Sequence, residues 1–258
     1  MPTVGPDVGS HPVTGIPGHQ PTDLVRSWSV RDFVLIWLGG FVGTGVMFAI
    51  GSLIGGTDLG FVLALAGQYV GNLGVLWLLK RSKEAGYLRF SIEGKDLLYV
   101  GLGFALQVAL AALFFPLTQL LFPDGRPPQE VAETLANADS PALMKMAVIL
   151  AAVVLAPVTE EIVFRGVLLR SVEHRGRRFA IVITALAFSA VHVLGLQVDR
   201  MAASAAVVLP PLFLLGLALA WLTLRNDRLG PAIFLHSGWN LLAAIFLLLP
   251  PELLAGVG

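Results

Sequence analysis

A few polar side chains in the second half of the chain have the types needed for hydrolysis. They are two adjacent glutamates, an arginine, two histidines and an asparagine: Glu160, Glu161, Arg165, His192, His236 and Asn240. A carboxylate can take a proton from water, and an imidazole can hold the water or pass the proton on. Amide and imidazole N–H groups can bind a developing oxyanion. This set therefore contains the groups that hydrolysis by an activated water requires.

Their spacing predicts which side chains meet if the segments are helical. Glu161 and Arg165 are four residues apart and share one helix face, so we expect a salt bridge between them. Glu160 is turned about 100° away, which leaves it free to point into a cavity. Two further pairs share a face for the same reason: Phe188 with His192, and His236 with Asn240.

The composition indicates a helical membrane protein. Apolar residues make up 56% of the 258 residues, and only 13% are charged, about half of what soluble domains carry. Mean hydropathy is +0.80. There is no cysteine, which excludes disulfides and thiolate sites, and 17 basic residues balance 17 acidic ones. Soluble enzymes, secreted disulfide scaffolds and DNA-binding domains are thereby excluded.

The hydropathy pattern predicts an all-α bundle of about seven or eight transmembrane helices. Seven apolar runs are long enough to cross a bilayer: 33–54, 60–79, 97–122, 143–169, 179–196, 201–224 and 231–249. The polar stretch 123–141 separates two of them. The predicted domains are a disordered N-terminal tail (1–30), N-terminal transmembrane helices (31–122) and a catalytic transmembrane core (143–249).

Ionisable residues inside membrane helices cost about 2.5–3.5 kcal/mol on insertion scales and usually have a function. At about 1.5 Å per residue along a helix, the candidate side chains lie about 8 to 20 Å from the helix ends that are expected to face the cytoplasm. We therefore expect one polar layer within the membrane, toward the cytoplasmic side and reached from it. Pro157 is expected to kink the fourth run. The first three runs offer mainly single amides, for which packing or interhelical hydrogen bonding is expected: Gln68, Asn72 and Gln107.

Three motifs resemble those of a known family. EExxxR at 160–165, FxxxH at 188–192 and HxxxN at 236–240, in this order, are similar to the motifs of the CPBP intramembrane proteases. This family is also called the Abi or CAAX-protease family and includes the type II CAAX prenyl endopeptidases. The resemblance covers about residues 143–249. It implies an intramembrane endopeptidase.

The resemblance also implies residue roles. Glu160 and His192 would activate a water, and His236 and Asn240 would stabilise the oxyanion. The remaining motif residues would support the site: Glu161, Arg165 and Phe188. The expected partners are the lipid bilayer and a peptide or membrane-protein substrate, without nucleic acid. The expected location is the plasma membrane of a bacterial-type cell.

The sequence excludes some other protease mechanisms and leaves other functions open. The sequence has no HExxH helix, no GxSxG turn and no pair of membrane aspartates. Glu160, His192 and His236 could bind zinc, and a metal-free glutamate mechanism fits the same residues. A non-catalytic scaffold or bacteriocin-immunity protein is an alternative. A proton-coupled transporter is another, although the first half has no counterpart of the polar layer.

The distribution of Lys and Arg predicts the topology. Thirteen basic residues fall on one side of the seven runs: Arg26, Arg31, Lys80, Arg81, Lys83, Arg89, Lys95, Arg170, Arg175, Arg177, Arg178, Arg225 and Arg228. Three fall on the other side: Arg126, Lys145 and Arg200. Because positive loops stay cytoplasmic, reporter fusions or cysteine labelling should place the N-terminus and the 170–178 connection inside and the C-terminus outside. A cytoplasmic C-terminus would contradict the helix count.

Overall fold

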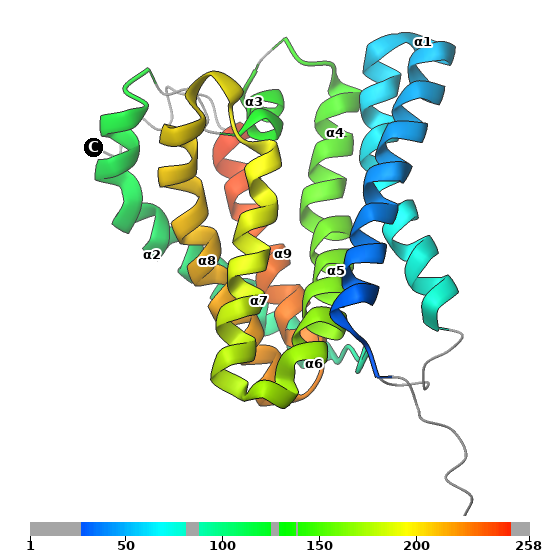
Figure 1. Ribbon diagram of the computed structural model, residues 1–258. Helices are drawn as coiled ribbons and strands as arrows, with labels where there is room; N and C mark the ends of the chain where they lie inside the picture. Colours follow the sequence, from blue (N-terminus) through cyan, green and yellow to red (C-terminus); the bar gives the residue numbers. More distant parts are fainter. Residues whose placement is uncertain (1–26, 81–87, 125–128, 138, 249–258) are drawn as a thin grey trace, which may run out of the picture.

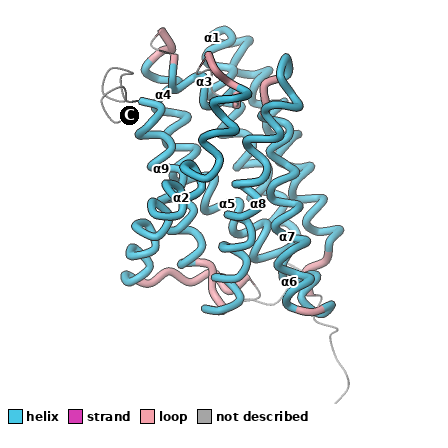
Figure 2. The backbone as a smooth tube through the Cα atoms, turned by 90° about the vertical axis from the view of Figure 1, so that its left-hand side faces the viewer, coloured by secondary structure: helices cyan, strands magenta, loops and turns pink. Residues whose placement is uncertain are grey.

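The computed structural model describes residues 27–80, 88–124, 129–137 and 139–248. The predicted tail lies outside the described residues up to position 26. Within them the regular elements are helices that run side by side along one direction, with most loops at the two ends (Figures 1 and 2). The all-α fold expected from the sequence is confirmed.

The first element, α1 (Val30–Lys80), is a helical hairpin. Its helical conformation breaks at Gly55 and Gly56, and Gly56 has a φ of 78°, which favours glycine. The two limbs lie side by side in Figure 1. They approach so closely that a Cβ on Gly43 would overlap the carbonyl oxygen of Gly67. Small residues thus allow backbone contact between the limbs.

A second group of elements follows the hairpin. A short 3-10 turn (Gly94–Leu97) leads into α2 (Leu98–Leu121), and α3 (Glu130–Ala136) follows. One long helix then contains α4 (Ala142–Leu150), a π-helical segment (Ala151–Leu155), α5 (Ala156–Glu160), a second π-helical segment (Glu161–Leu168) and α6 (Leu169–Val172). The last three helices are α7 (Arg177–Val191), α8 (Met201–Asn226) and α9 (Gly230–Leu248).

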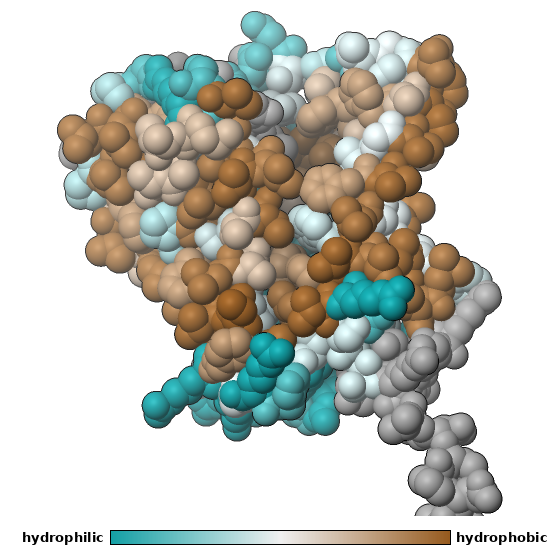
Figure 3. All heavy atoms as spheres, in the orientation of Figure 1, coloured by the Kyte–Doolittle hydropathy of each residue, from teal (hydrophilic) through white to brown (hydrophobic). Residues whose placement is uncertain are grey.

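These helices account for all seven predicted membrane runs. Six segments of the described chain are long and apolar enough to cross a membrane, and the first is the 51-residue hairpin α1, which contains two runs. Figure 3 shows a broad apolar band with hydrophilic residues gathered mainly at its ends. The short helix α3 was not predicted. It has only seven residues, too few to cross a bilayer.

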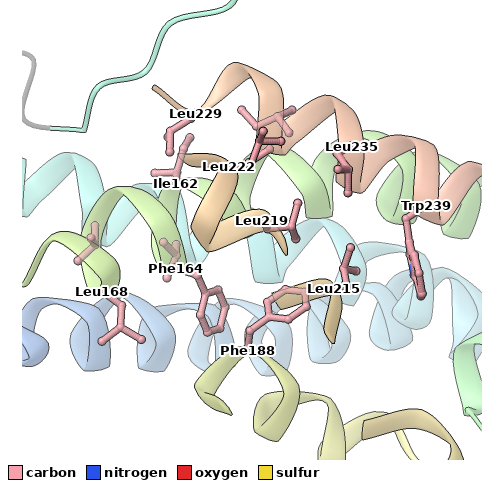
Figure 4. Close-up of a cluster of buried hydrophobic side chains, with 14 of the residues drawn as sticks. Ile162, Phe164, Leu168, Phe188, Leu215, Leu219, Leu222, Leu229, Leu235 and Trp239 are labelled. Atoms are coloured by element: carbon pink, nitrogen blue, oxygen red, sulfur yellow. The ribbon is translucent and has the colours of Figure 1, made fainter. Parts of the chain in front are cut away.

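The helices pack through small residues and aromatic rings. Helix α2 lies along α9, where a Cβ on Gly103 would overlap the carbonyl oxygen of Leu235. The hairpin α1 is held against the second π-helical segment by Trp37, whose ring meets that of Phe164 edge-on at 5.7 Å. Figure 4 shows the buried core around Phe164 and Phe188.

Ion pairs join the connections at the end of the bundle where α6 lies, which we call the basic end. Asp227, between α8 and α9, pairs with Arg89 and with Arg170 of α6. Arg228 pairs with Asp96 at the start of the α2 segment. We call the opposite end, where α3 lies, the α3 end. The ion pairs fix the order of the helices at the basic end.

The contact between α2 and α9 gives a stability prediction. Gly103→Val should lower the melting temperature in detergent, because overpacking a tight contact typically costs about 1–3 kcal/mol. Gly101→Val is the matched control, since a Cβ at that position on the same helix would meet nothing within 4 Å. Equal melting temperatures for the two variants would contradict the close approach of α2 and α9.

Candidate active site

A buried ion pair lies at the centre of the site. Arg165 donates from Nη1 to Glu161 Oε1 at 3.0 Å, and both side chains are fully buried. Arg165 Nη2 also donates to the carbonyl oxygen of Gly216 on α8, at 3.3 Å. The pair predicted from the spacing is therefore confirmed, and it connects two helices.

His236 of α9 joins this pair. Its Nδ1 lies 3.0 Å from Glu161 Oε1, and the side chain is 3% exposed. One carboxylate oxygen thus receives both Arg165 and His236, while Oε2 has no hydrogen-bond partner among the described residues. Sequence analysis missed this contact, because the two residues are 75 positions apart and no helical spacing relates them.

Phe188 of α7 packs against the charged groups. The guanidinium of Arg165 lies 4.5 Å from the centre of its ring, a distance at which a cation interacts favourably with an aromatic face. The same ring meets the rings of His192 and His236 edge-on, at 5.0 and 5.6 Å. Phe188 therefore sets the positions of both imidazoles by contact.

His192 follows the last residue of α7, where the helix tightens into a 3-10 turn. Its Nδ1 lies 2.8 Å from the carbonyl oxygen of Phe188. A carbonyl only accepts hydrogen bonds, so Nδ1 carries the proton. In the neutral ring Nε2 then keeps a lone pair, which can accept a proton or hold a water.

Asn240 binds a carbonyl group that a proline leaves unpaired. In the first π-helical segment the N–H of Ala156 donates to Ala151, five residues back. The next bond in this register would run from Pro157 to the carbonyl of Ala152, but proline has no N–H. Asn240 Nδ2 donates to that oxygen instead, at 2.7 Å. Pro157, predicted to kink the helix, thereby provides an attachment point for α9.

One cavity brings the candidate residues together. It has a volume of about 630 Å³, within the usual range for ligand sites. All four side chains with predicted catalytic roles line it: Glu160, His192, His236 and Asn240. Glu160 Oε2 is buried and has no hydrogen-bond partner among the described residues. The two adjacent glutamates thus differ, because Glu161 is held in the ion pair and Glu160 lines the cavity.

The first half of the chain supplies polar side chains to the same cavity. They come from the second limb of α1 and from α2: Gln68, Tyr69, Asn72 and Gln107. The sequence indicated only packing or interhelical hydrogen bonding for the three amides. A helical-wheel comparison would have shown Gln68 and Asn72 on one face, but nothing in the sequence pairs that face with Glu160.

The cavity extends away from the basic end. The layer itself lies nearer that end, since His236 is in the second turn of α9. Toward the α3 end the cavity is bordered by Gln129, Leu135 and Gly195, and no described residue of the basic connections lines it. Buried apolar side chains, among them Ile162 and Leu222, form a cluster between the helices (Figure 4). The described part of the basic connections thus does not border this cavity, and the expected approach to the site from that end stays a prediction.

The described residues do not group as a metal site. No three His, Cys, Asp or Glu side chains among them lie close enough to hold one ion. The set considered for zinc, Glu160, His192 and His236, lines one cavity without forming such a group.

The contrast between the glutamates gives a prediction. Glu161→Ala and Arg165→Ala should each lower melting temperature as well as activity, because removing one partner of a buried ion pair typically costs about 3–5 kcal/mol. Glu160→Ala should lower activity with little loss of stability. The measurements are thermal unfolding in detergent and cleavage of a reporter peptide. A stable, inactive Glu161→Ala together with an unstable, active Glu160→Ala would mean that the two roles are reversed.

Comparison with known proteins supports the motifs. The family model described as "Rce1-like: Type II CAAX prenyl endopeptidase Rce1-like" matches residues 142–242, which include all three motifs. No curated protein and no solved structure matches the chain. The matched range runs from the start of α4 into α9 and therefore carries the candidate catalytic residues. The match over residues 142–242 thus agrees with the resemblance to the CPBP/CAAX protease family that the motifs indicate.

Proposed function

We propose that the protein is an intramembrane endopeptidase that hydrolyses a peptide bond of a membrane-associated protein or peptide. One observation carries the proposal. Glu160 lines the same cavity as His192, and its Oε2 has no hydrogen-bond partner among the described residues, while the adjacent Glu161 is held by Arg165 and His236. The family match supports a CAAX-type protease in general terms. The glutamate and histidine mechanism and the substrate are our proposals.

The proposed reaction begins with a water between Glu160 and His192. Glu160 accepts a proton from the water, whose oxygen attacks the carbonyl carbon of the substrate and forms a tetrahedral oxyanion. The C–N bond then breaks, and the leaving nitrogen takes the proton from Glu160. The products are a carboxylic acid and an amine, and Glu160 returns to its starting form. A lone pair on His192 Nε2 orients the water.

His236 and Asn240 are proposed to stabilise the oxyanion. Because Glu161 only accepts hydrogen bonds, His236 Nδ1 carries a proton. Its Nε2 can donate only when the ring is an imidazolium. Asn240 has a second amide hydrogen besides the one directed at Ala152.

The proposed location is the plasma membrane of a bacterial-type cell, with the N-terminus in the cytoplasm. In this orientation the α3 end faces away from the cytoplasm, and the cavity extends toward the outer side of the membrane. A substrate segment would then approach from that side or from the bilayer. The topology experiment decides this orientation independently of the chemistry.

Loss of the proposed base should abolish proteolysis without loss of protein. Glu160→Gln and His192→Ala should each lower the cleavage rate at least about 100-fold, the usual contribution of a general acid or base, while the protein still accumulates in the membrane. Comparative membrane proteomics of wild-type and Glu160→Ala cells should show a protein that accumulates uncleaved. Purified variants and a reporter peptide give the rate.

Glu173→Gln is the matched control, since this carboxylate pairs with Arg170 at the basic end, outside the cavity. Glu173→Gln should cleave the reporter peptide at the wild-type rate. Near-normal turnover by Glu160→Gln would remove the general-base role and favour a non-catalytic membrane scaffold. Inactivation by a chelator with recovery only on zinc would show that Glu160, His192 and His236 act through a metal.

A further inference from the structure

Two amide side chains that line the cavity have a buried oxygen without a hydrogen-bond partner among the described residues. Asn72, on the second limb of α1, is only 2% exposed, and its Oδ1 has no hydrogen-bond partner among the described residues. Gln107 Oε1, on α2, is likewise buried and unpartnered. Both residues line the cavity that contains Glu160. Gln68, one turn before Asn72, lines it as well.

Packing does not account for these amides. A buried polar atom without a hydrogen bond destabilises the folded protein, and a leucine or methionine would fill the same volume without this cost. The two oxygens come from different helices and border one space. Asn72 fits there because its neighbour is Gly40, where a Cβ would overlap the amide oxygen. The arrangement is that of acceptors prepared for a donor from outside the chain.

The substrate itself brings such donors. A helical segment must unwind before its peptide bond can be attacked, and unwinding leaves N–H and C=O groups without partners. Inside a membrane those groups need hydrogen bonds from the protein, because lipid provides none. Amide side chains can pair with either group whatever the substrate sequence is. A cleavage site in the membrane therefore requires such partners beside the catalytic groups.

We infer that Asn72 and Gln107 form a subsite that binds the main chain of an extended substrate peptide, next to Glu160. This inference rests on the proposed proteolytic function and assigns substrate binding to the half of the chain outside the family match at 142–242. The two oxygens accept hydrogen bonds from backbone N–H groups on either side of the scissile bond. Gln68 borders the same stretch of peptide.

The test measures binding without cleavage. The full-length Glu160→Gln protein is titrated in lipid nanodiscs with a fluorescent peptide that ends in a farnesylated CAAX sequence. A second probe carries N-methyl groups on the two amides that flank the scissile bond, and therefore lacks those donors. Asn72→Leu and Gln107→Met are added to the Glu160→Gln protein. Asn226→Leu is the control, because this amide bonds to its own helix at Leu222 and lies outside the cavity.

We expect Asn72→Leu and Gln107→Met each to raise Kd for the unmodified peptide about fivefold to tenfold, as the loss of one hydrogen bond does. The melting temperature should stay level or rise. The N-methylated probe should bind the variants and the parent protein equally, within twofold. Asn226→Leu should change neither Kd.

The inference is overturned if the variants raise Kd equally for both peptides, or if they change Kd for neither peptide. It is also overturned if the melting temperature falls in step with binding, since the amides would then be structural. The two proposals fail separately. Cleavage by the Glu160→Gln protein would refute the general base and leave the difference between the two probes in place.

Discussion

The Glu161 carboxylate holds the site together. It lies fully buried and accepts hydrogen bonds from Arg165 on its own helix and from His236 on α9. Arg165 in turn reaches a backbone carbonyl of α8 and lies over the ring of Phe188 on α7. An unpaired charge at this depth would be costly, so four helical segments are constrained to meet at one point. The positions of both histidines follow from this constraint.

Much of the fold could be predicted from the sequence, because membrane helices are defined by local hydropathy. The seven apolar runs and the Glu161–Arg165 pair depend on residues close together in the chain. The His236–Glu161 contact and the bond from Asn240 to Ala152 depend on how α9 packs. No local pattern encodes that packing. The lining of the cavity depends on the same packing, since apolar side chains from several helices fill the rest of the bundle.

The two halves of the chain contribute differently to the cavity. The motif-bearing half supplies every ionisable group of the polar layer except the Tyr69 hydroxyl. The first half supplies amides. Its Trp37 ring packs against the ring of Phe164 in the motif-bearing half. Single amides in a membrane helix are common enough to be read as packing groups. Only their position in the cavity that Glu160 also lines indicates another role.

The π-helical segments 151–155 and 161–168 have a consequence for how this helix could change through mutation. A π turn is a helical turn with one extra residue. Gaining or losing a residue there moves the side chains within the turn by one position, about 100° around the axis, while the helix on either side can stay docked. A single-codon insertion or deletion could thus exchange which of two neighbouring side chains faces the cavity. The tandem glutamates 160 and 161 lie at such a boundary, where a shift of one codon would swap a buried anchor for a cavity-facing acid.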